Sequence, residues 1–85
     1  MTLMGLTDFN LPRNCATSVL RELERGALPG HYLRCLRSSL KMTPSWFGDR
    51  LGLTGQAVAS LEHTVVVPDE FYPVISALCR EVLDA

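Results

Sequence analysis

The segment from Met42 to Pro68 constrains the fold of this chain more than any other part of the sequence. Thr43 followed by Pro44 is typical of a helix start, because threonine caps the first free amides and proline lacks the amide that would be left unpaired there. The run Leu51-Gly52-Leu53 indicates a helix that ends at the glycine, which adopts a left-handed backbone without steric cost. Thr54 then provides a second cap. The sequence therefore predicts two short helices joined by a tight turn.

Apolar periodicity predicts further helices around this segment. Each helix repeats apolar residues at spacings of three and four, the pattern of a helix with one buried face. The expected helices cover residues 14–25, 31–41, about 44–51, 54–63 and about 69–83. Asn14 is the expected cap of the first helix. We therefore expect an all-α fold, with a single helical domain over residues 14–85.

The segments outside these helices are expected to be irregular. Residues 1–13 contain Gly5 and Pro12 and are expected to form a flexible arm. Val65–Val67 are few and isolated, so they are interpreted as an extended loop rather than as a strand. Trp46 is expected to pack under the first helix or the arm, with an exposed interface aromatic as the alternative.

Composition places the chain among globular proteins. It has 85 residues, of which 47% are apolar and 20% charged, which is unlike a disordered segment. No apolar run approaches the roughly 20 residues that cross a bilayer, and no secretory signal is evident. The expected location is cytoplasmic, with no membrane partner. Cys15, Cys35 and Cys79 are expected to be small buried thiols, and neither a metal site nor another cofactor is expected.

Charge is distributed unevenly along the chain. Residues 31–64 carry four basic and two acidic side chains, a net charge of +2, whereas residues 65–85 carry one basic and four acidic side chains, a net charge of −3. The whole chain has a formal net charge of −1. Positive charge thus collects on the segment with the two short helices, where binding of an anionic partner is most favourable.

The segment from Leu33 to about Leu83 resembles the phage-repressor and Cro family of helix-turn-helix regulators. The matching positions follow one another in the family's order without gaps. They are Leu36-Arg37, Thr43, Phe47, Leu51-Gly52-Leu53, Thr54, Val58, Leu61-Glu62 and Pro68. The resemblance implies a five-helix lambda-repressor-like fold, here with an extra N-terminal helix and a helix-turn-helix core over residues 31–83. It also implies a partly buried structural ion pair between Arg37 and Glu62.

The resemblance implies a transcriptional repressor that places helix 54–63 in the major groove of double-stranded DNA. The positions that match the family's base-reading residues are Gly55, Gln56, Ala59 and Ser60. Gln56 is suited to an adenine edge, Ser60 to several bases, and Ala59 to a thymine methyl. The candidate phosphate-binding residues are Arg34, Lys41, Arg50 and Thr54. A homodimer on a palindromic operator is also implied.

Two other classes of function are alternatives to DNA binding. A protein-protein interaction module would keep the helix-turn-helix fold without base reading and would use Trp46, the valine loop or the arm to hold a protein partner. This alternative is open because Pro44 replaces the polar residue with which the family contacts phosphate, and because Gly55 and Ala59 carry no hydrogen-bonding side chain. An enzyme is not expected, because the sequence has no nucleophile beside a base, no paired carboxylates and no phosphate loop.

Overall fold

The computed structural model describes the backbone of residues 2–84 and the side chains of residues 11–84, and the described part is all-α. Five α-helices and one 3-10 turn follow one another along it, with no strand among the described residues. They are α1 (Thr2–Arg25), α2 (Gly30–Ser39), α3 (Pro44–Leu51), α4 (Gly55–Glu62), η1 (Asp69–Phe71) and α5 (Tyr72–Asp84). The expected helical class and helix number are therefore confirmed. No helix within the described residues is long and apolar enough to cross a membrane.

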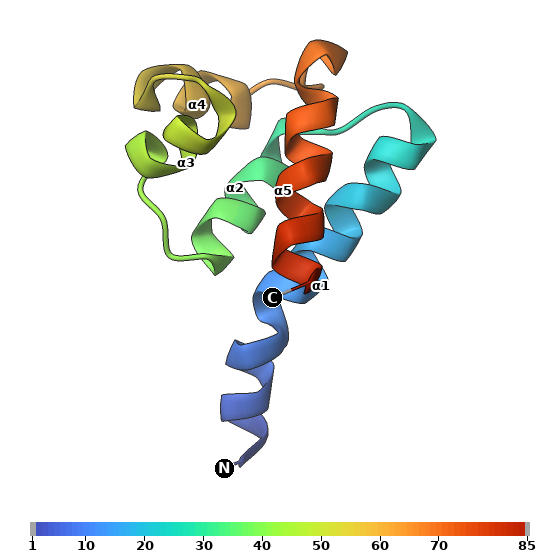
Figure 1. Ribbon diagram of the computed structural model, residues 1–85, viewed down its shortest axis with the longest axis vertical. Coiled ribbons are helices and arrows are strands. Elements are labelled where there is room, and N and C mark those ends of the chain that lie inside the picture. The colour runs from blue at the N-terminus through green and yellow to red at the C-terminus, as the bar shows by residue number, and fades with distance from the viewer. Residues whose placement is uncertain (1, 85) are drawn as a thin grey trace.

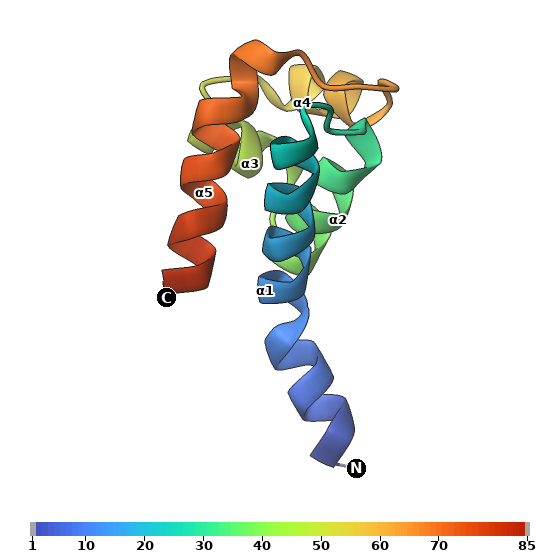
Figure 2. The same cartoon turned by 90° about the vertical axis from the view of Figure 1, so that its right-hand side faces the viewer.

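The helices form two groups around one apolar core (Figure 1). Helix α1 packs against both α5 and α2, and α3 packs against α4. Helix α2 also contacts α4, so it joins the short-helix pair to the longer helices. Figures 1 and 2 show α5 beside α1, with α3 and α4 together at one end of the molecule. The largest fully buried side chains are Phe47, Leu28, Leu33, Leu36, Ile75, Val19, Val58, Val67 and Cys79.

The N-terminal segment differs from the expected arm. Helix α1 starts at Thr2, so Asn14 lies inside the helix and is not its cap. Pro12 also lies inside α1. A proline removes one backbone hydrogen bond and pushes the preceding turn aside, which bends a helix without always ending it. In Figure 2 the first turns of α1 extend past the C-terminal end of α5, away from the other helices.

Helix α2 ends two residues earlier than expected, because the chain reverses at Lys41. Lys41 has a φ of 59°, the one non-glycine residue with a positive φ among the described residues. The amide of Lys41 donates to the carbonyl of Ser38 at 3.0 Å, and the amide of Met42 donates to the carbonyl of Arg37 at 3.2 Å. This pair of bonds is the Schellman pattern of helix ends, in which glycine usually occupies the left-handed position. A lysine side chain is thus held outside the helix on a sharp turn.

The segment after α4 is a loop and not a strand, as expected, but it bends at residues 64–66 instead of being extended, and it is anchored at one end. The amide of Val67 donates to the carbonyl of Leu28 at 2.7 Å, and the amide of Leu28 donates to the Tyr72 hydroxyl at 3.0 Å. Val67 is fully buried, whereas Val65 is 86% exposed and Val66 46% exposed. The loop between α1 and α2 and the loop after α4 are therefore fastened to each other and to the start of α5.

Candidate nucleic-acid interface

The helix pair α3–α4 is built by local capping. The Thr43 hydroxyl accepts from the amide of Trp46 at 3.2 Å, and the Thr54 hydroxyl accepts from the amide of Ala57 at 3.1 Å. Gly52 ends α3 with a φ of 75°. The amide of Leu53 then donates to the carbonyl of Gly48 at 2.8 Å. All four features follow from residues within a few positions of one another, and together they form a helix, a tight turn and a second helix.

Helix α4 has a buried side and a solvent-exposed side. Val58, Leu61 and Glu62 are buried against the rest of the molecule. The opposite side carries four exposed residues at spacings of three, four and seven, which form one continuous row along a helix. This row, called here the α4 outer face, consists of Gln56, Ala59, Ser60 and His63. The first three were predicted as base-reading residues. His63 was missed, although its spacing of seven from Gln56 could have revealed it.

Gly55 does not belong to the α4 outer face. A Cβ atom built on Gly55 would lie 2.8 Å from the Ser45 hydroxyl oxygen and 3.0 Å from the Ser45 amide nitrogen. A side chain at position 55 would therefore point at the start of α3 and not at solvent. Gly55 allows the two helix starts to approach closely, and no larger residue at this position has room to reach a base.

Arg37 and Glu62 form the expected structural ion pair. Nε of Arg37 donates to Oε2 of Glu62 at 2.6 Å, and Nη2 donates to Oε1 at 3.2 Å. Nη1 also donates to the carbonyl of Met42 at 3.0 Å. The hydrogen bond to Glu62 raises the pKa of the Arg37 guanidinium, with a further rise from the Glu62 charge and an opposing effect of burial. The hydrogen bonds of Arg37 therefore tie α2, the following turn and α4 together.

The predicted phosphate-binding residues lie in different places. Arg34 is exposed and lies on α2 between Gly30 and Arg37, at spacings of four and three. A Cβ on Gly30 would meet the carbonyls of Leu61 and Thr64, and Arg37 bonds to Glu62 of α4. Because Arg34 lies between these two residues on the same face of α2, it lies on the side of α2 that faces α4. Lys41 is exposed on the turn before α3.

Arg50 and Thr54 are engaged within the protein. Arg50 forms an ion pair with Glu81 of α5, which directs its guanidinium toward α5. The Thr54 hydroxyl caps α4, so its oxygen already accepts a hydrogen bond. Arg34 and Lys41 are therefore the predicted phosphate ligands for which no internal ion pair is found among the described side chains.

Trp46 is 64% exposed on α3, so the expectation that it packs under α1 is wrong. Phe47 and Leu51 form the buried side of α3, and successive residues of a helix point about 100° apart. Trp46 consequently points away from the core that Phe47 enters. The exposure of Trp46 agrees with the alternative interpretation of the sequence, in which its side chain is available to a partner.

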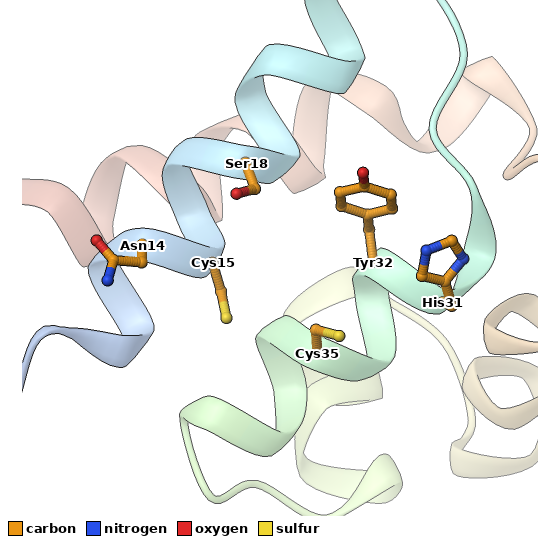
Figure 3. Close-up of a pocket in the computed structure, with 6 residues that line it drawn as sticks. All are labelled: Asn14, Cys15, Ser18, His31, Tyr32 and Cys35. Atoms are coloured by element: carbon orange, nitrogen blue, oxygen red, sulfur yellow. The ribbon is translucent and has the colours of Figure 1, made fainter. Parts of the chain in front are cut away.

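A groove of about 280 Å³ lies between α1 and α2. Figure 3 shows its lining of side chains from the two helices. They are Asn14, Cys15, Ser18, His31, Tyr32 and Cys35. Cys35 is exposed and Cys15 half-buried, so the expected burial of all three thiols holds fully only for Cys79. Burial raises the pKa of the Cys79 thiol to about 11. No group of three or more metal-ligating side chains is found in the described part of the chain.

The α4 outer face, with Arg34 on the adjoining side of α2, is the candidate nucleic-acid interface, and Lys41 lies on the turn after α2. It combines small and hydrogen-bonding side chains on an exposed helix face with a cationic side chain, Arg34, on the neighbouring helix. Comparisons of the chain with protein-family models, with curated proteins and with solved structures find no match.

Proposed function

We propose that this chain is a sequence-specific DNA-binding regulator that reads the major groove with α4. The observation that carries the proposal is the α4 outer face, an exposed row of side chains on the second helix of the α3–α4 pair. A helix with its side chains is about 10–12 Å across, which matches a major groove about 12 Å wide. The resemblance to phage-repressor and Cro proteins supports the same placement.

Base reading is proposed for Gln56, Ser60 and Ala59. The side-chain amide of Gln56 can donate to N7 of adenine and accept from the N6 amino group of the same base, because it carries both a donor and an acceptor. The Ser60 hydroxyl can donate or accept, and the methyl group of Ala59 fits against a thymine methyl. The α4 outer face carries neither arginine nor lysine, the side chains that most often read guanine. The proposed site is therefore rich in A·T pairs where α4 enters the groove.

Affinity is proposed to come from Arg34, Lys41 and the free amides at the start of α4. Arg50 contributes less, because binding phosphate requires it to leave Glu81. Two cationic contacts per chain predict a slope of about −2 per chain in a plot of log affinity against log salt concentration. A homodimer on a palindromic operator, with half-sites about 34 Å apart, doubles that slope and completes the proposed repressor.

The experiment is a fluorescence-anisotropy titration with DNA from upstream of the gene, since small regulators often control themselves. Unrelated DNA of equal length is the control, and salt is varied from 50 to 200 mM. We expect selective binding that weakens steeply with salt. Equal binding of both DNAs contradicts sequence reading, and no binding at 50 mM salt contradicts the proposal altogether.

A protein-protein interaction module is the second candidate, favoured by the exposure of Trp46 and Val65. Aromatic side chains are frequent at the centres of protein interfaces. The two functions predict different effects of Trp46→Ala. A DNA reader keeps its DNA affinity, because Trp46 lies outside the α4 outer face. An interaction module lacks DNA binding and loses its protein partner when Trp46 is replaced.

A further inference from the structure

His63 completes the α4 outer face at its C-terminal end. It follows Ser60 by three residues, Ala59 by four and Gln56 by seven, and its side chain is exposed. The backbone amide of His63 donates to the carbonyls of Ser60 and Leu61, so the residue continues the turn of α4 as its C-cap. An imidazole in this row meets whatever molecule the other three residues meet.

We propose that protonated His63 contacts a DNA phosphate and that the affinity of the protein for DNA rises as the pH falls from 7.5 to 6. This inference rests on the proposed function and adds a regulating condition to the same surface. Histidine is the side chain that ordinarily changes charge between about pH 5 and 8. The imidazolium is a donor at both ring nitrogens, so it forms charge-assisted hydrogen bonds with phosphate oxygens.

The groups packed near this end of α4 favour a phosphate there. The charged groups of α2 on this side are Arg34, which is exposed, and Arg37, which is held by Glu62. The Glu62 carboxylate adjoins His63 in sequence but accepts two hydrogen bonds from Arg37, so its charge is balanced.

The remaining titratable and charged groups of the neighbouring elements include His31, which follows Gly30, and the Cβ direction of Gly30 meets the carbonyls of Leu61 and Thr64. The charged residues of α3 are Asp49 and Arg50, and α3 meets α4 at the opposite end, where Ser45 faces Gly55. That end is about 12 Å from His63, at 1.5 Å per residue of α4. Asp69 and Glu70 follow the valine loop in η1. His31 lines the groove between α1 and α2 (Figure 3) and serves as the matched control.

Proton linkage gives the size of the effect. A complex in which His63 is protonated takes up at most one proton per chain from solvent, so affinity changes by at most tenfold per pH unit for each chain. We expect affinity to be roughly three to ten times higher at pH 6 than at pH 7.5. The added cation also steepens the salt slope by about 0.9 per chain at pH 6, an effect that a merely structural histidine does not produce.

The test measures DNA affinity by fluorescence anisotropy at pH 6.0 and 7.5, each at several salt concentrations. The proteins are wild type, His63→Gln, His63→Arg and His31→Gln. We expect His63→Gln to bind with the same affinity and salt slope at both pH values, and His63→Arg to bind at both as wild type does at pH 6. His31→Gln is expected to behave as wild type. Circular dichroism at both pH values confirms that each protein is folded.

The outcomes separate this inference from the proposed function. Equal wild-type affinity at the two pH values overturns the role of His63 and leaves DNA binding intact. A pH effect that survives in His63→Gln, or disappears in His31→Gln, also overturns it. Absence of binding to any DNA at 50 mM salt overturns both the proposed function and this inference.

Discussion

Arg37 and Glu62 are joined by two hydrogen bonds, of 2.6 and 3.2 Å, although they lie on different helices, 25 residues apart. The Glu62 side chain is 5% exposed and the Arg37 side chain 17% exposed. Removal of one partner leaves the other charge in a site with little water, which typically costs about 3–5 kcal/mol. This contact therefore makes the orientation of α4 depend on α2.

Replacement of either partner is expected to destabilise the protein strongly. Arg37→Ala and Glu62→Ala should each lower the free energy of unfolding by about 3 kcal/mol or more, and the double variant by clearly less than the sum, because it leaves no charge unpaired. Urea denaturation measures all three. Arg50→Ala is the control, because its pair with Glu81 is exposed and should contribute less than about 1 kcal/mol. Additive single effects contradict the coupling.

Lys41→Gly is expected to stabilise the protein by about 0.5–1 kcal/mol. The φ of 59° at Lys41 is strained for a residue with a Cβ atom and unstrained for glycine. Lys41→Ala keeps the strain and removes the charge, so it should leave the melting temperature almost unchanged. Calorimetry of the two variants separates backbone strain from charge. A Lys41→Ala protein as stable as Lys41→Gly shows that charge, not conformation, controls stability here.

Gly55→Ala is expected to destabilise the protein by about 1–3 kcal/mol, the usual range for overpacking. Alanine is the better helix former by about 1 kcal/mol, so the clash with the backbone of Ser45 must outweigh this gain. Ala59→Gly, on the exposed side of the same helix, should cost about 1 kcal/mol through propensity alone. Chemical denaturation compares them. A stabilised Gly55→Ala protein contradicts the close approach of α3 and α4.

The three cysteines are expected to react with iodoacetamide in the order Cys35, Cys15, Cys79. Exposure decreases in this order, and burial raises the pKa of Cys79 to about 11, which suppresses its thiolate. Peptide mass spectrometry at successive times measures the order. Cys79 should become reactive only in denaturant. Early labelling of Cys79 in the native protein contradicts its placement in the core.

Cys79 is also expected to make stability decline at high pH. Its folded pKa is raised from the ordinary 9.0 to about 11, so the unfolded chain loses the thiol proton first. The protonated thiol thus contributes its full stability below pH 9, and this contribution is lost as the pH rises toward 11. Cys79→Ala should be less stable than wild type at pH 7, and this difference should shrink between pH 9 and 11. Thermal unfolding across this range tests the sign.

Gln56→Ala is expected to relax base discrimination without abolishing DNA binding. Selection from random DNA first defines the preferred site, and each A·T to G·C change near Gln56 should then cost the wild type about 1–3 kcal/mol. The variant should lose most of that difference at one position. Lys41→Ala should instead weaken binding to all sequences and reduce the salt slope by about 0.9 per chain. Unchanged discrimination in Gln56→Ala contradicts its proposed role.

The features that were predictable from the sequence are those decided by neighbouring residues. The Thr43 and Thr54 caps and the left-handed Gly52 each depend on backbone groups within four positions, so a local pattern is sufficient. The Arg37–Glu62 pair is not local. It was expected because Arg37 and Glu62 match the two positions that form such a pair in the phage-repressor and Cro family. The structure contains the two hydrogen bonds of this pair.

The features that were not predictable depend on contacts between distant segments. Nothing near Arg50 in sequence indicates its pairing with Glu81, which follows from the placement of α5 beside α3. The direction of the missing Cβ of Gly55 depends on how close Ser45 lies. Pro12 was interpreted as the end of an arm, although one lost hydrogen bond is compatible with a continuous helix.

The packing of α1 against α5 has a consequence for synthesis on the ribosome. The guanidinium of Arg13 donates to the carbonyl of Leu83 at 2.8 Å, so residues from nearly opposite ends of the chain meet in the folded molecule. The two short helices are translated between them and emerge while α1 still lacks α5, one of its two neighbours. The part of the apolar surface of α1 that packs against α5 therefore stays exposed to solvent during synthesis until α5 has emerged.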